Sequence, residues 1–167
     1  MRKALSLAGQ VATYAAFALL VGWFSASPSY THVDPASAVI RLSFDHATAR
    51  VTECRPLTPE EIAKLAPNMR RSLDCPRGRV PLLVELELDG ALLYRAAVPP
   101  SGLAGDGPAT VYERFVVPPG THEVTARLRD SRRTEGFDYE SSVRVELAAS
   151  RNFVIDFRPE TGGFVFK

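Results

Sequence analysis

The chain lacks a surplus of charge of either sign. Over 167 residues it has 20 Lys and Arg against 19 Asp and Glu, which is a formal net charge of +1 at pH 7. Nucleic-acid-binding domains usually carry a strong basic excess, so this composition disfavours that class. The length favours a single core with an appendage over two full-sized domains.

Recognised catalytic motifs are also missing. The sequence contains no G-x-S-x-G elbow, no H-E-x-x-H helix, no Walker loop and no G-x-G-x-x-G fingerprint. The histidines His32, His46 and His122 have no nucleophile or metal ligand at a recognised spacing, and we expect His122 to be a packing residue on a strand. We therefore expect no enzymatic activity and no cofactor.

Residues 4–24, ALSLAGQVATYAAFALLVGWF, contain no charge. At about 1.5 Å per helical residue this run spans the roughly 30 Å hydrocarbon core of a bilayer. Arg2 and Lys3 precede it, so the positive-inside bias predicts that residues 1–3 are cytoplasmic and that the bulk of the chain is exported. We expect a single-pass helix in a bacterial inner membrane, with the remainder in the periplasm.

A cleaved signal peptide is the alternative reading of the N-terminus. Ser25, Ala26 and Ser27 are small residues at a plausible cleavage position, but Pro28 is poorly placed for cleavage and the apolar run is longer than usual. Residues 25–37 are rich in Ser, Pro and Ala and predict a tether to a periplasmic domain. Both readings export the domain.

Cysteine is scarce, with only Cys54 and Cys75. In an oxidising compartment two such residues predict a disulfide, which over a loop of this length contributes roughly 3 kcal/mol. Reduced thiols would leave two other readings open. Cys54, Cys75, Met69 and His46 could hold Cu(I), or the two cysteines could form a redox pair, although C-x-x-C spacing is absent.

Between the cysteines lies the only strong helix signal outside the N-terminus. Thr58 is a predicted N-cap, Pro59 suits the first helical position, and Glu61 completes a capping box. Ile62 and Leu65 form a narrow apolar stripe, which we expect to lie on the sandwich. Residues 54–75 are thus a predicted helical insertion.

The rest of residues 38–167 predicts short strands with period-two alternation, beginning with Ala38 to Phe44. Asp89-Gly90 predicts a two-residue hairpin turn. The predicted fold is mainly β, an antiparallel β-sandwich with one transmembrane helix and a short helical insertion. After the Asp89-Gly90 turn, Leu92, Tyr94, Ala96 and Val98 are predicted to share one face of the return strand, with Leu93, Arg95 and Ala97 on the other. The residues expected to face inward are Leu82, Val84, Leu86, Leu88, His122, Val124, Ala126, Leu128, Val143, Val145, Leu147, Phe153, Ile155 and Phe157.

Three segments between Val80 and Phe157 share a pattern: VELELDGALLY, FVVPPGTHEVTARLRD and VELAASRNFVIDF. A strand pair precedes a proline-glycine turn into a strand of the form G-x-H-x-V, and a late strand closes the sheet. This arrangement resembles periplasmic β-sandwich modules of the immunoglobulin-like, transthyretin-like and PEGA type. The resemblance covers about half the chain and implies a fold but no activity.

An anchor, a disulfide-bounded insertion and missing catalytic motifs favour an interaction or accessory module for an envelope protein or membrane complex. One alternative is a metal-handling or thiol-redox factor in respiratory metalloprotein assembly that uses Cys54 and Cys75. Another is a glycan or small-ligand module, although Trp23 is the only tryptophan. The residues expected to contact a partner are Arg55, Lys64, Met69, Arg70, Arg71, Leu103 and Phe137.

Overall fold

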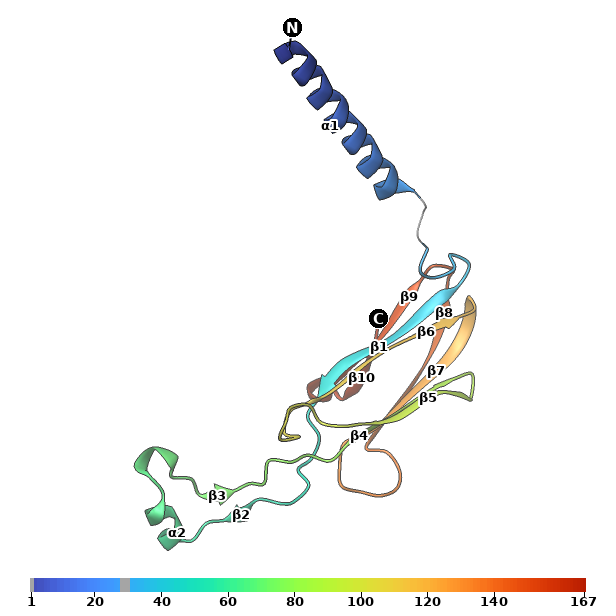
Figure 1. Cartoon of the computed structure of the whole chain (residues 1–167). Helices are drawn as coiled ribbons and strands as arrows, with labels where there is room; N and C mark the ends of the chain where they lie inside the picture. Colours follow the sequence, from blue (N-terminus) through green and yellow to red (C-terminus); the bar gives the residue numbers. More distant parts are fainter. Residues whose placement is uncertain (1, 28–30) are drawn as a thin grey trace. The chain divides into compact units, whose positions relative to one another are not determined.

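The computed structural model describes residues 2–27 and 31–167, and it divides after Asp34 into two compact units (Figure 1). Residue 1 of the expected cytoplasmic N-terminus and residues 28–30 of the expected tether lie outside the described residues. We call the second unit, Pro35–Lys167, the β unit.

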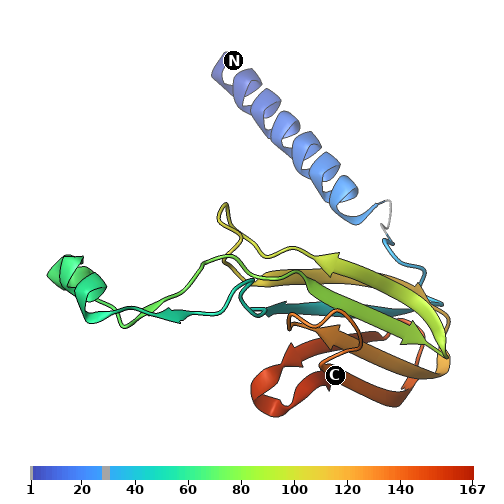
Figure 2. The same ribbon diagram turned by 90° about the horizontal axis from the view of Figure 1, so that it is seen from below.

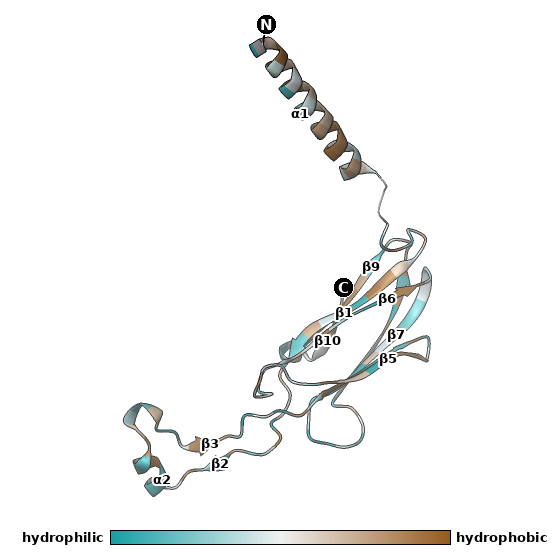
Figure 3. Ribbon diagram, in the orientation of Figure 1, coloured by the Kyte–Doolittle hydropathy of each residue, from teal (hydrophilic) through white to brown (hydrophobic). Residues whose placement is uncertain are grey.

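Helix α1 spans Arg2–Ala26 and contains the whole predicted run 4–24. Its stretch Lys3–Ala26 is long and apolar enough to cross a membrane. Figure 3 shows its hydrophobic colouring, and its large side chains, such as Leu5 and Trp23, are exposed. The helix extends two residues beyond the predicted end because Ser25 and Ala26 continue the helical turn without a breaker before Pro28.

The β unit contains two four-stranded sheets, seen from two sides in Figures 1 and 2. One has the order β10-β9-β1-β6 and the other the order β5-β4-β7-β8. The strands are β1 (Ala38–His46), β4 (Leu82–Leu88), β5 (Ala91–Val98), β6 (Ala109–Val117), β7 (Gly120–Arg129), β8 (Tyr139–Leu147), β9 (Asn152–Arg158) and β10 (Gly163–Phe166).

One strand pair departs from the predicted antiparallel arrangement. β1 and β9 run parallel, with Val39 opposite Asn152 and Leu42 opposite Ile155. The other pairings within the two sheets are antiparallel across the described residues. Period-two alternation shows which face of a strand is buried, but it does not show the direction of a neighbour that is distant in sequence.

Side chains from both sheets form one hydrophobic cluster, and most of the predicted inward residues belong to it. Val143 and Val145 are only partly buried because β8 is an edge strand. The predicted inward residues that are fully buried are Leu82, Val84, Leu86, Val124, Ala126, Leu128, Leu147, Phe153, Ile155 and Phe157.

The hairpin between β4 and β5 confirms its turn and corrects one side chain. Asp89 and Gly90 have φ angles of 53° and 77°, as the two-residue turn requires. The register then shifts, because Leu86 pairs with Tyr94 whereas Glu87 pairs with Leu92. This bulge turns Leu93 toward the core and leaves Leu92 58% exposed, so the prediction that Leu92 shares a face with Tyr94 and that Leu93 lies opposite is wrong.

The outer face of the β5-β4-β7-β8 sheet is polar, but it buries one charge. Glu85 lies opposite both Arg95 and Arg127. These two side chains cover it, so that only 6% of Glu85 is exposed. Arg127 contacts Glu85 at 2.9 Å, Glu87 at 2.5 Å and Glu140 at 3.1 Å. Hydrogen bonds to these carboxylates, first of all Glu87, raise the pKa of the Arg127 guanidinium.

Two 3₁₀ turns and a small separate ribbon complete the chain. The turn η2 spans Pro159–Thr161 between β9 and β10. The predicted insertion contains β2 (Arg55–Pro56), α2 (Pro59–Lys64), η1 (Pro67–Met69) and β3 (Leu73–Asp74). We call residues 54–75 the arm.

The arm does not pack as expected. None of the residues of α2 is buried, and Ile62 and Leu65 are only half-buried. Figures 1 and 2 both show the arm extending away from the two sheets. The expectation that α2 lies on the sheets is therefore wrong, since two apolar side chains on a six-residue helix offer little area to bury.

Truncating one core side chain tests the register of the hairpin. Leu86→Ala removes a fully buried side chain and is expected to lower the free energy of unfolding by about 2–5 kcal/mol. Leu92→Ala, at the exposed position next to the bulge, is expected to change it by less than about 0.5 kcal/mol. Urea unfolding followed by circular dichroism measures both, and equal losses would contradict the assigned register.

Candidate functional site

The chain leaves the two four-stranded sheets and returns to them at one place, which we call the stem: residues 48–51 and 78–80. The Val51 N–H donates to the Gly78 carbonyl at 3.0 Å, and the Val80 N–H donates to the Ala49 carbonyl at 3.0 Å. Buried Thr48 donates its hydroxyl to the Val80 carbonyl at 2.5 Å. These bonds bring the two ends of the insertion together.

Beyond the stem, the predicted disulfide joins Cys54 and Cys75. Next to it β2 and β3 form a short antiparallel ribbon, with Arg55 opposite Asp74. The Leu57 N–H continues the ladder to the Ser72 carbonyl at 2.9 Å. The ribbon was not predicted, because two-residue strands are too short to show a period.

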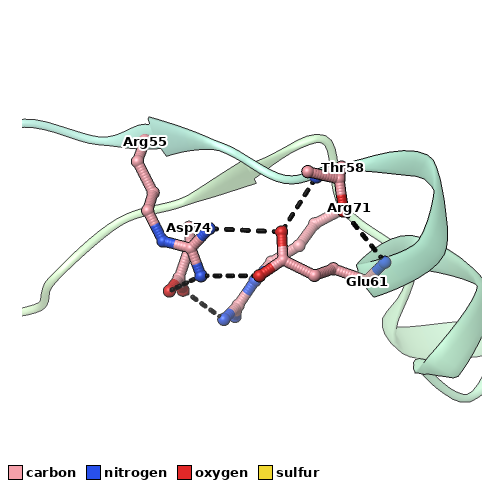
Figure 4. A network of polar contacts seen from close by, with 5 residues as sticks. All are labelled: Arg55, Thr58, Glu61, Arg71 and Asp74. Carbon is pink, nitrogen blue, oxygen red and sulfur yellow. Dashed lines mark hydrogen bonds and ion pairs between the residues drawn. The ribbon is translucent and has the colours of Figure 1, made fainter.

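The predicted capping box is present at the start of α2. The Glu61 N–H donates to the Thr58 hydroxyl at 3.3 Å, and the Thr58 N–H donates to the Glu61 carboxylate at 2.9 Å (Figure 4). Pro59 occupies the first turn. The helix ends at Lys64, because Ala66, the residue before Pro67, is extended, as expected before proline.

An ionic network connects this helix to the ribbon. Arg55 donates to both carboxylate oxygens of Glu61, at 3.0 and 3.2 Å, and Arg71 donates to Asp74 at 2.6 Å (Figure 4). Arg55 also lies 3.9 Å from Asp74. The hydrogen bond from Arg55, assisted by the Thr58 backbone, lowers the pKa of Glu61 to about 2. The same pair raises the pKa of Arg55.

Five of the seven predicted partner residues lie in the arm and are exposed: Arg55, Lys64, Met69, Arg70 and Arg71. Arg55 and Arg71 are held in the network, whereas Lys64 and Arg70 have no ion-pair partner within residues 2–27 and 31–167. The Met69 side chain is 62% exposed. Sequence reasoning missed Leu73, which is 48% exposed on β3 next to these cations.

Leu103 is fully exposed on an ordered loop beside the stem. The loop closes through the Ser101 N–H, which donates to the Pro108 carbonyl at 3.1 Å. Two contacts join this loop to the chain at the base of the arm. Arg77 binds the carboxylate of Asp106 in the loop at 2.6 Å, and the Arg79 N–H donates to the Gly105 carbonyl at 3.0 Å. The structure therefore places Leu103 at the same end of the β unit as the base of the arm.

Phe137, the seventh predicted residue, is half-buried. The Arg127 guanidinium lies 5.9 Å from the centroid of its ring. Its carbonyl also accepts a hydrogen bond from Arg133 at 2.9 Å. Phe137 therefore covers the polar face of its own sheet, and less of its ring is available to a partner.

The four residues of the alternative copper site lie in different settings. Cys54 and Cys75 are oxidised, and Met69 lies in η1 of the arm. His46 binds Asp130 at 2.6 Å at the end of β1, and its side chain is only 11% exposed. In the described part of the chain, no three His, Cys, Asp or Glu residues are grouped to hold a metal.

His122 is held by hydrogen bonds at both ring nitrogens. Nδ1 contacts the Asp89 carboxylate at 2.7 Å, and Nε2 contacts the Pro118 carbonyl at 3.0 Å. The hydrogen bond to Asp89 raises the pKa of His122. Asp89 also accepts the Glu123 N–H at 2.9 Å, so His122 links the hairpin turn to β7.

The network in the arm makes its order dependent on acid pH. The folded pKa of Glu61, about 2, lies below the ordinary 4.5, so its stabilisation is complete above about pH 4.5 and is lost as the pH falls toward 2. Carboxyl NMR titration of Arg55→Gln is expected to show a Glu61 midpoint raised toward 4.5. A wild-type midpoint already near 4.5 would show that Arg55 does not bind Glu61 in solution.

No protein-family model, no curated protein and no solved structure matches this chain. The functional inference therefore depends on the arm, the stem and the two sheets themselves.

Proposed function

We propose that this chain is a membrane-anchored, non-enzymatic module whose arm binds a protein partner in the cell envelope. The observation that carries the proposal is that the arm is ordered by its own contacts while its side chains stay exposed. The disulfide, the capping box and the Arg55–Glu61 pair all lie within it. Order without burial is expected of a surface that is shaped for recognition.

The partner is a protein surface with an apolar centre and acidic groups around it. Met69 and Leu73 supply exposed apolar area on the arm. Lys64 and Arg70 supply cations without an internal ion-pair partner among the described residues, whereas the cations of the network are already neutralised. Apolar anchors with flanking charges are typical of interfaces in which a few residues dominate the affinity.

Within the β unit, the entry of the chain and the arm lie at opposite ends of β1. The chain that follows α1 enters this unit at Pro35, before the start of β1, and the stem follows the other end of β1. Nine residues of strand separate the two ends, which is about 30 Å at 3.3 Å per residue. The arm and Leu103 thus lie at the end of β1 opposite to Pro35.

The two sheets are proposed to be a β-sandwich of the immunoglobulin-like or transthyretin-like type. Support comes from the single hydrophobic cluster that both sheets share. In one of them β1 lies between β9 and β6, so the first strand and a late strand of the unit are neighbours.

The proposed location is the bacterial inner membrane, with α1 as a retained anchor and the β unit in the periplasm. The length and apolar character of Lys3–Ala26 support the anchor. A disulfide persists in an oxidising compartment, so the Cys54–Cys75 bond supports export. Arg2 and Lys3 at the start of the helix support a cytoplasmic N-terminus.

Site-specific photocrosslinking in native membranes tests the proposal. A photoreactive side chain at Met69 is expected to capture one defined protein, and the same probe at Arg144, exposed on β8, is expected to capture none. Lys64→Glu combined with Arg70→Glu is expected to reduce the Met69 product at least about fivefold, because two cations become repulsive. Arg151→Glu is the matched control outside the arm.

Two results would contradict an arm-directed partner. One is the absence of a Met69 product while the protein is present at wild-type level in the membrane. The other is an equal yield of the same product from Arg144. If the variant with both charges reversed still gave the Met69 product, a partner would bind the arm, but Lys64 and Arg70 would not contribute to that binding.

A further inference from the structure

A second surface feature, separate from the arm, lies on the outer face of the β5-β4-β7-β8 sheet. It is a cavity of about 280 Å³ at the end of the sheet that carries the 130–138 loop. Its floor is a row of cross-strand neighbours, in which Leu83 lies opposite both Ala97 and Arg129. Its remaining lining residues are Val80, Pro81, Ser131, Arg132 and Arg133.

Arg129 is the unusual member of this lining. As a whole residue it is half-buried, and its Nη1 donates to the exposed carbonyl oxygens of Thr134 at 2.7 Å and Gly136 at 3.3 Å. Within the described residues it has no carboxylate partner. A guanidinium has five N–H donors, so most of them remain for another acceptor. An anion in the cavity would supply the counter-charge that Arg129 lacks among the described residues.

The other two arginines are already paired. Arg132 contacts Glu53, and Arg133 contacts Asp138 at 3.3 Å. Ser131 donates its hydroxyl to the same Asp138 at 3.0 Å. The cavity is thus lined by three guanidinium groups, and two of them are each paired with a carboxylate. The positive charge of the third, Arg129, has no carboxylate partner among the described residues.

Apart from the arginines and Ser131, the lining is apolar and consists of Val80, Pro81, Leu83 and Ala97. A fully hydrated inorganic anion would gain little from these side chains, whereas a hydrocarbon chain would bury apolar area against them. One surplus charge matches a singly charged group, and a planar carboxylate matches the fork of a guanidinium.

We propose that this cavity binds a small organic monoanion, a carboxylate on a short hydrocarbon chain. The carboxylate contacts the free N–H groups of Arg129, and the hydrocarbon lies on Leu83 and Ala97. This site is independent of the arm and of the proposed partner, so either inference can fail without the other.

Hexanoate is the probe, and two comparators are used with it. Hexanol has the hydrocarbon chain without the carboxylate, and acetate has the carboxylate without the chain. The full chain in non-ionic detergent, labelled with ¹⁵N-arginine, reports on the Arg129 Nε–H signal by NMR. Hexanoate is expected to shift this signal saturably and to bind at least about tenfold tighter than acetate. Hexanol is expected to leave it unmoved up to the same concentration. An absent or non-saturable hexanoate shift, or an equal response to hexanol, would overturn the proposal.

Two variants separate binding from folding. Arg129→Gln retains an N–H donor for the loop carbonyls but removes the charge, and it is expected to weaken hexanoate binding about tenfold or more. Leu83→Ala leaves Arg129 in place and is expected to reduce the preference for hexanoate over acetate. Arg144→Gln, on β8 and outside the cavity, is the control with unchanged affinity.

Because Arg129→Gln removes the Arg129 signal, hexanoate binding to the variants is followed through the Nε–H signals of Arg132 and Arg133, which also line the cavity. The backbone amides of the same two residues report whether the 130–138 loop is intact. Arg129→Gln with wild-type affinity would overturn the assignment of the carboxylate to Arg129. If Leu83→Ala kept the wild-type preference for hexanoate over acetate, the assignment of the hydrocarbon to Leu83 would be overturned. This test holds even where Arg129→Gln disturbs the 130–138 loop, because Leu83 lies outside that loop.

Discussion

The hydrogen bonds of the stem are the contact on which the organisation of the β unit depends. β1 and β4 belong to different sheets, yet the chain between them carries the whole arm. Thr48, Ala49 and Val51 pair with residues 78–80, so the chain returns to the point at which it left. For the packing of the core, β4 follows β1 almost directly. The arm therefore adds little to the entropic cost of closing the loop between these two strands.

This arrangement separates two kinds of order. The core is held by burial, with side chains such as Ile40, Leu86 and Ile155 fully removed from water. The arm has almost no burial and is held by a covalent bond, a cap and exposed ion pairs. Exposed ion pairs contribute little individually. The disulfide is therefore the strongest single constraint within the arm, because it shortens the chain that the weak contacts must order.

Local features of the fold could be predicted from the sequence, because they depend on neighbouring residues. The alternation in β4, β7 and β9 identified core residues such as Leu128 and Phe153, and Thr58 with Glu61 identified the helix start. The parallel β1/β9 pair could not be predicted, since nothing local specifies a partner more than a hundred positions away. Leu92 was misassigned because a bulge changes the phase of alternation without a composition signal.

The candidate sites could be predicted only in part, for the same reason. The cysteines and exposed cations of the arm were visible as sequence features. The burial of Glu85 and the uncompensated charge of Arg129 depend on cross-strand neighbours, which only the register of the sheets supplies. Of the four arginines Arg127, Arg129, Arg132 and Arg133, three are paired with carboxylates and Arg129 has no carboxylate partner among the described residues.

Native-state hydrogen exchange of a Cys54→Ser, Cys75→Ser variant tests most directly whether the arm and the core are ordered separately. The Leu57 amide, bonded across the ribbon to Ser72, is expected to lose protection, while the Val80 amide of the stem and the amides of β4 and β7 keep wild-type protection. A parallel loss in the stem and the core strands would show that the disulfide holds the whole β unit, and it would contradict the separation of arm and core.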